Sequence, residues 1–257
     1  METLNNIVLT IQNYMSNYVL IIALLGAGLW FSFRLGFIQV RGFGEGMRRT
    51  FGGLFSKKGE AGADGMSSFQ ALATAIAAQV GTGNIAGAAT ALAIGGPGAI
   101  FWMWIAAFLG MATIYAEAIM AQKYKTVGAD GQVTGGPVYY IRAAFKGTFG
   151  KVLAGIFAIL ITLALGFMGN AVQSNSIAAS FHTAFGIPQW IMGLVVAVIA
   201  IFVFMGGMKR IAKVTETIVP FMAALYIIGS LIVIIYNYKN IPYAFASILS
   251  EHFHQVL

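Results

Sequence analysis

Long apolar stretches alternate with short polar segments along this chain, and the pattern predicts membrane-spanning helices. A helix needs about 20 apolar residues to cross a bilayer. Six stretches approach or exceed that length, at residues 18–33, 67–94, 97–121, 151–181, 188–205 and 214–236. The pattern therefore predicts an all-α polytopic membrane protein, with a single transmembrane domain over residues 1–257.

The second predicted span is interrupted by Gly81, Gly83 and Asn84. Each glycine costs a helix about 1 kcal/mol relative to alanine. The half that precedes the break, residues 67–80, is about 21 Å long at 1.5 Å per residue, so a break at 81–84 falls near the middle of the bilayer. Unwound backbone at that depth is tolerated where it lines a cavity or is buried in protein.

The broken span provides two kinds of binding group. The half-helix that begins near Asn84 presents free N–H groups, which bind a carboxylate. The half-helix before the break ends in free carbonyls, which can coordinate a monovalent cation and belong to Ala78, Gln79 and Val80. Broken helices of secondary transporters use this arrangement for anionic substrate groups and sodium. The alternative is a glycine kink that only serves helix packing.

The fourth predicted span is about 46 Å long as a helix, and small and polar residues form a stripe along it. The stripe consists of Thr162, Gly166, Gly169, Gln173, Ser176 and Ser180. Such a face points into a bundle or an aqueous path rather than toward lipid. The amide of Gln173 can donate to a carboxylate and accept from an ammonium group, so we expect it to contact substrate. Hydrogen bonding between helices is the alternative.

Two carboxylates lie inside predicted spans. Glu117 is near the end of the third span and Lys123 follows it, so we expect an ion pair at the membrane surface rather than a proton relay. Glu216, near the start of the sixth span, has a similar explanation.

The basic residues predict the orientation of the spans. With six spans, 14 of the 15 lysines and arginines fall on one side of the membrane, and only Lys239 does not. Basic loops face the cytoplasm, so the N-terminus and the tail, residues 237–257, are expected to be extracytoplasmic. The cytoplasmic loop 39–65 is basic and rich in glycine. It is either an amphipathic segment on anionic lipid headgroups or an ordinary loop.

The composition supports a membrane protein. Hydrophobic residues make up 59% of the 257 residues, mean hydropathy is +0.82, and charged residues are only 9%. Soluble domains carry roughly 25% charged residues. A soluble enzyme and a nucleic-acid partner are therefore excluded, despite a net charge of +7. The chain has no cysteine, only three histidines and no plausible catalytic pair, so we expect neither an intramembrane enzyme nor a cofactor. A channel is a separate alternative, because a broken helix can also line a pore.

Four sequence motifs resemble the alanine or glycine:cation symporter family. They are GTGNIAG at residues 81–87, GGPGAIFWMW at 95–104, GGP at 135–137 and QSN at 173–175. The resemblance implies sodium-coupled symport of a small neutral amino acid, alanine or glycine, across the cytoplasmic membrane. It also implies a leading helix plus the first five-helix repeat of a leucine-transporter-type inverted-repeat fold. The substrate-binding residues that it implies are Thr82, Gly83, Asn84 and Gln173.

Family members are longer than this chain and contain a second repeat. The alternative to a complete symporter is therefore a non-transporting fragment, or one half of a split transporter that needs a second-repeat chain as partner. The other expected partners are the amino acid, Na⁺ as coupling ion and the lipid bilayer.

Overall fold

The computed structural model describes residues 2–54, 68–128 and 133–251, and helices dominate this part of the chain. Two short strands, β1 Thr126–Val127 and β2 Val133–Thr134, pair antiparallel, with Thr126 opposite Thr134. Ser67, residues 55–65 of the predicted cytoplasmic loop and residues 252–257 of the predicted tail lie outside the described residues.

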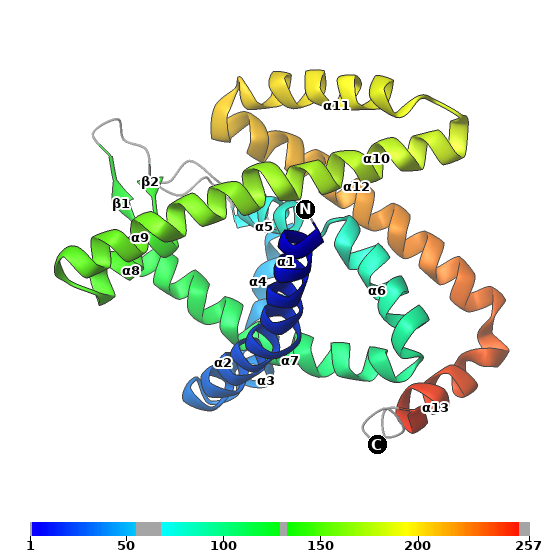
Figure 1. The fold of residues 1–257 in the computed structure, drawn as a ribbon. Coiled ribbons are helices and arrows are strands. Elements are labelled where there is room, and N and C mark those ends of the chain that lie inside the picture. The colour runs from blue at the N-terminus through cyan, green and yellow to red at the C-terminus, as the bar shows by residue number, and fades with distance from the viewer. Residues whose placement is uncertain (1, 55–67, 129–132, 252–257) are drawn as a thin grey trace.

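Helices follow one another closely along the chain (Figure 1). In order they are α1 Glu2–Tyr14, η1 Met15–Leu20, α2 Ile21–Arg34, α3 Ile38–Arg41, α4 Phe43–Leu54, α5 Ser68–Gln79, α6 Thr82–Gly95, α7 Gly98–Lys123, α8 Pro137–Ala144, α9 Gly147–Ile161, η2 Thr162–Gly169, α10 Asn170–Phe185, α11 Gln189–Phe204, α12 Gly207–Tyr236, η3 Tyr238–Asn240 and α13 Ile241–Glu251. The segments η1 and η2 are π-helical turns inside longer rods, and η3 is a 3₁₀ turn.

Within residues 2–54, 68–128 and 133–251, four helices are long and apolar enough to cross a membrane. They are Asn5–Arg34, Gly98–Lys123, Gly147–Phe185 and Gly207–Tyr236, and the apolar helix Gln189–Phe204 is shorter. The expected stretch 18–33 is the second half of the first rod, because the helical pattern of the chain continues back to Glu2. Large apolar side chains remain exposed along these rods, Trp30 and Phe202 among them, as expected of helices whose solvent is lipid.

The helices α2 and α7 make a close contact at Gly28. A Cβ atom at this position would lie 2.8 Å from Leu109 Cβ and 3.1 Å from the Leu109 backbone. Only glycine lets the two helices approach this closely, in the manner of small-residue contacts between membrane helices. Leu109 and Ala112 are both buried at this contact.

A buried polar network fixes the end of α2. Ser32, which is fully buried, donates to Gly28 O at 2.7 Å and accepts from Gln39 Nε2 at 2.6 Å. Gln39 also donates to Phe108 O of α7 at 3.2 Å. Gln39 reaches this position because the chain reverses after α2 through Gly36 and Phe37, both of which have positive φ. The network therefore ties the short helix α3 to the α2–α7 pair.

The helix α5 packs against α12, and polar contacts cross this interface. Gln70 Nε2 donates to Glu216 Oε2 at 2.8 Å, and the hydroxyls of Thr74 and Thr215 lie 3.1 Å apart. Ala73 is buried on the same face of α5. Glu216 therefore accepts a hydrogen bond from a half of the broken helix, and the structure shows no ion pair of Glu216 with another described residue.

The predicted ion pair between Glu117 and Lys123 is wrong. The ion pairs in the described part of the chain are those of Glu45, and Lys123 Nζ instead lies 5.5 Å from the ring centroid of Tyr124. Six residues correspond to about 600° of helical rotation, which places the two side chains on different faces of α7. Glu117 instead lies near Tyr140 of α8, which packs on α7. Burial raises the pKa of Tyr140, and the negative charge of Glu117 raises it further.

The contact at Gly28 gives a stability prediction. We expect Gly28→Ala to destabilise the protein by about 1–3 kcal/mol, because the added methyl group forces α2 and α7 apart. Gly26→Ala is the matched control, since a Cβ atom there has no neighbour within 4 Å. The measurement is the apparent melting temperature of each purified variant in detergent. If both variants melt at the same temperature, the close α2–α7 contact is wrong.

Candidate functional site

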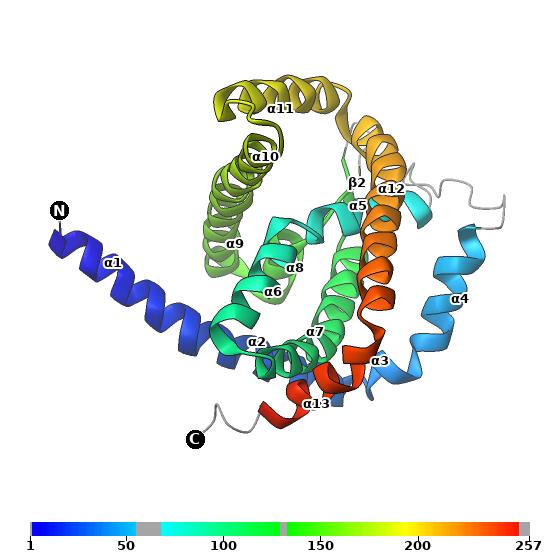
Figure 2. The same cartoon turned by 90° about the vertical axis from the view of Figure 1, so that its right-hand side faces the viewer.

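The broken helix is present, and its break is shorter than expected. The helix α5 ends at Gln79 and α6 begins at Thr82, so only Val80 and Gly81 leave helical conformation. The two half-helices diverge from this point (Figure 2). The predicted break covered residues 81–84. Thr82, Gly83 and Asn84 instead form the first turn of α6. Side-chain oxygens of Asn84 and Gln173 accept hydrogen bonds from backbone N–H groups at the start of this helix.

Asn84 closes the first turn of α6 onto Gly81. Its Oδ1 accepts from Gly81 N–H at 3.0 Å, and its own N–H donates to Gly81 O at 3.1 Å. Because Gly81 has no side chain, this is one half of a capping box. The side chain of Asn84 therefore stabilises the break, because its amide oxygen is hydrogen-bonded to the backbone N–H of Gly81.

Gln173 satisfies the next donors of the same turn. Its Oε1 accepts from Thr82 N–H at 3.2 Å and from Thr82 Oγ1 at 3.1 Å. Gln173 lies in the first turns of α10, directly after the π-helical segment η2. The amide oxygen therefore lies at the N-terminus of α6, where the helix dipole favours negative charge.

Gly81 is required at the break for steric reasons. Its φ of −127° is open to any residue, so the backbone does not demand glycine. A Cβ atom at this position would collide with the side-chain amide of Gln173. Glycine at position 81 therefore allows Gln173 to reach Thr82.

The backbone N–H of Gly83 is the one backbone donor in the first turn of α6 for which the described residues provide no acceptor. In the first turn of α6 the N–H groups of Gly81, Thr82 and Asn84 all donate, whereas no acceptor is found for Gly83 N–H within the described residues. Gly83 is exposed, and a Cβ atom built there meets nothing within 4 Å. Gly83 N–H is therefore a backbone donor, next to Thr82, for which the described residues provide no acceptor.

The end of α5 provides acceptors on the other side of the break. Its last backbone hydrogen bond in the described structure runs from Val80 N–H to Ile76 O. The four carbonyls that follow Ile76 O are outside the helical ladder, and those of Ala78, Gln79 and Val80 are among them. The negative end of one half-helix thus adjoins the positive end of the other. No cluster of three or more His, Cys, Asp or Glu residues occurs in the described ranges, so a cation here would meet neutral oxygens.

Most of the polar stripe predicted on the fourth span makes contacts only within its own helix. Thr162 donates to Ala158 O, Asn170 to Gly166 O and Ser180 to Ser176 O. The π-helical turn at Thr162–Gly169 also changes the register, because it takes up more residues per turn than an α-helix. Of the stripe residues in the described structure, Gln173 is the one whose side chain is seen to bond to another element.

The residues expected to form the site thus lie together. Thr82, Gly83 and Asn84 form the first turn of α6, Gln173 contacts that turn, and the three carbonyls of α5 precede it. Sequence reasoning missed the steric role of Gly81 and the contact of Gln70 with Glu216. Each depends on segments far apart in the chain, and no local pattern signals them.

Comparison with known proteins identifies the family. The model of the sodium:alanine symporter family matches residues 1–256. The sodium/alanine symporter AgcS of Methanococcus maripaludis is 42% identical over 250 residues, which cover 96% of this chain and 54% of that protein.

Two relatives from Bacillus subtilis agree with this result. The putative sodium/proton-dependent alanine carrier YrbD is 46% identical over 90% of this chain and 46% of its own length. The probable sodium/glutamine symporter GlnT is 40% identical over 98% of this chain and 51% of its own length. The chain thus spans about half the length of these relatives. It belongs to the sodium:alanine symporter family, a family of membrane transporters and not of enzymes.

Proposed function

We propose that this chain takes part in sodium-coupled symport of a small neutral amino acid, alanine or glycine, across the cytoplasmic membrane. The observation that carries the proposal is the position of Gln173 Oε1, which accepts two hydrogen bonds from Thr82 at the start of α6. Family membership supports sodium and an amino acid as the transported species.

In this proposal the Gln173 amide oxygen holds the place of a substrate carboxylate oxygen. The carboxylate displaces it and accepts from Thr82 N–H and Oγ1–H, and a second carboxylate oxygen accepts from Gly83 N–H. Hydrogen bonds to a charged group are stronger than those to a neutral amide. Released Gln173 then uses its Nε2 group to donate to the carboxylate. After the exchange the N–H groups of Thr82 and Gly83 both have a carboxylate oxygen as acceptor.

Sodium binds on the other side of the break in this proposal. The carbonyls of Ala78, Gln79 and Val80 supply neutral oxygens, and a bound carboxylate adds a negative charge close by. Each ligand therefore improves the site for the other, and the coupling is reciprocal as thermodynamics requires. A hard monovalent cation suits these oxygen ligands better than a transition metal.

The break also provides a hinge for transport. The half-helix α5 packs on α12, whereas α6 packs on α7. Val80 and Gly81 join two segments that are anchored to different helices, so a substrate bound across the break acts on both. The arrangement fits the leading helix and first five-helix repeat of a leucine-transporter-type fold. We further propose six spans, with the N-terminus and the tail outside the cell.

The direct test is uptake of radiolabelled alanine by cells that express the chain. We expect uptake that requires Na⁺, is not supported by K⁺, and is inhibited by unlabelled glycine. Glutamine is included as a competitor because one relative carries its name. Uptake that is the same in Na⁺ and K⁺, or no uptake above that of cells without the chain, contradicts the proposal.

Replacement of Gln173 tests its contact with substrate. We expect Gln173→Leu to weaken sodium-dependent alanine binding by about 10- to 100-fold, because a hydrogen bond to a charged group contributes about 1.5–3 kcal/mol. Ser180→Ala on the same helix is the control, since Ser180 bonds only to Ser176 O in the described structure. Equilibrium binding of labelled alanine to purified protein is the measurement. Equal affinity of Gln173→Leu and the control rules out the assigned role.

Replacement of Gly81 tests the geometry of the break. We expect Gly81→Ala to reduce alanine binding about tenfold or more, because the new methyl group takes the space from which the Gln173 amide would donate to the bound carboxylate. Gly87→Ala in α6 adds the same methyl group where no atom lies within 4 Å, and it should bind as the parent does. The same binding assay measures both variants. Loss of binding in Gly87→Ala but not in Gly81→Ala would refute the close approach.

A further inference from the structure

Two adjoining pockets lie where α2, α3, α4 and α7 meet. The first, with a volume of about 600 Å³, has apolar walls formed by Ile38, Phe43, Met47, Met111 and Tyr115. The second, of about 480 Å³, shares Ile38 and Tyr115 and adds Phe33 and Ile119. Together they form a groove that runs from the end of α2 across to α7, and it plays no part in the site at the broken helix.

The groove lies at the depth of a membrane surface. Arg34 is the last residue of the apolar rod Asn5–Arg34, and Lys123 is the last residue of the apolar helix α7. The groove begins beside Arg34, and its α7 wall runs from Met111, in the middle of that helix, to Ile119, near its C-terminal end. One part of the groove therefore borders lipid tails and the other borders headgroups.

Arginines surround the polar edge of the groove. Arg34 and Arg41 line the second pocket, and Arg49 lines the first. Arg48 lies beside Arg49 on the same helix. All four side chains are exposed, and none of the four pairs with a carboxylate other than Glu45 within the described residues.

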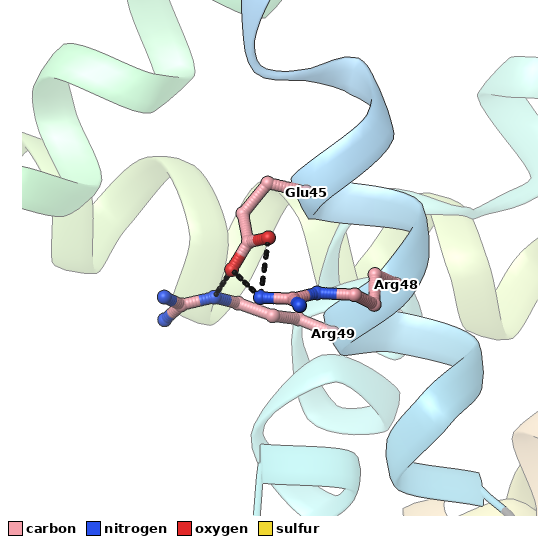
Figure 3. A network of polar contacts seen from close by, with 3 residues as sticks. All are labelled: Glu45, Arg48 and Arg49. Carbon is pink, nitrogen blue, oxygen red and sulfur yellow. Dashed lines mark hydrogen bonds and ion pairs between the residues drawn. The ribbon is translucent and has the colours of Figure 1, made fainter.

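Glu45 does not neutralise this edge. Its carboxylate contacts Arg48 at 2.7 Å and Arg49 at 2.6 Å, as Figure 3 shows. Hydrogen bonds from Arg49 and Arg48 lower the pKa of Glu45, so the carboxylate stays charged and holds the two guanidiniums side by side. One negative charge faces two positive charges, which leaves a surplus for an external anion.

The helix α4 has the form of an interfacial helix. Phe43 and Met47 lie one turn apart and both contribute to the apolar wall, Arg49 lies at the edge of the same pocket, and Arg48 lies outside it. In Figure 2, α4 stands apart from the long rods. A basic amphipathic helix next to a membrane span binds anionic lipid through both its apolar face and its charges.

We propose that this groove binds an anionic phospholipid, with its headgroup at the edge lined by Arg34, Arg41 and Arg49 and an acyl chain on the apolar wall. The shape of the site favours an amphiphile over inorganic phosphate, because phosphate alone would leave the apolar wall uncovered. The placement between two membrane rods favours a lipid over an acidic peptide. Guanidinium groups suit phosphate because they donate two hydrogen bonds in parallel.

The test is native mass spectrometry of the purified full chain with phosphatidylglycerol or phosphatidylcholine. We expect phosphatidylglycerol to bind tighter than phosphatidylcholine, and Arg41→Gln/Arg49→Gln to weaken it about 10- to 30-fold. The charge-matched control Lys209→Gln/Lys213→Gln, on exposed positions of α12, should bind phosphatidylglycerol as the parent does. Equal binding of the two lipids, or equal loss in both double variants, overturns the proposal.

A second pair of variants tests the apolar wall without a change of charge. Gly46 lines the first pocket, whereas Gly44 does not, and a Cβ atom at either position meets nothing within 4 Å. We expect Gly46→Leu to fill the pocket and lower phosphatidylglycerol binding about tenfold, with binding to Gly44→Leu unchanged.

A competition experiment distinguishes a phospholipid site from a simple anion site. Inorganic phosphate is added at millimolar concentration to the parent protein with bound phosphatidylglycerol. Its failure to displace the lipid supports a phospholipid site, whereas full displacement indicates a simple anion site and contradicts the proposal.

Discussion

The hydrogen bonds from Thr82 to Gln173 are the interactions on which the site depends. A break in a membrane helix leaves backbone donors without partners, and each such group is costly away from water. Here Asn84 satisfies Gly81 N–H, and Gln173 satisfies Thr82 N–H from a helix 91 residues away. The absence of a side chain at Gly81 makes this approach possible. The break is therefore a stable feature with its own partners, which a charged ligand can replace.

The packing around the break separates its two halves. Gln70 and Thr74 connect α5 to Glu216 and Thr215 of α12, whereas α6 packs on α7, which in turn is joined to α2 at Gly28. The contact at Gly28 tolerates little displacement, because a Cβ atom there would lie 2.8 Å from Leu109 Cβ. A ligand bound across Val80 and Gly81 would therefore connect the half-helix on α12 to the half-helix next to the close α2–α7 contact.

Sequence patterns predicted the helical membrane architecture and the presence of the break, because apolar length and glycine content are local properties. They placed the break two residues too wide, since the capping by Asn84 and Gln173 depends on tertiary contacts. Helical periodicity predicted a continuous polar stripe on the fourth span, but the π-helical turn at Thr162–Gly169 changed its register. The prediction of a Glu117–Lys123 ion pair was wrong because residues six positions apart lie on different faces of an α-helix. The partner of Glu216 comes from α5, 146 residues away, and no local pattern reveals such a contact.

Hydrogen–deuterium exchange at the start of α6 tests the central claim most directly. If a carboxylate replaces Gln173 at this helix end, the amides of Thr82 and Gly83 should exchange about tenfold more slowly with alanine and Na⁺ together than with either alone. Exchange in the remainder of α6 should change little. Protection that spreads evenly over α6 and α7, or the same exchange with alanine in K⁺ as in Na⁺, would contradict a substrate and sodium site at the break.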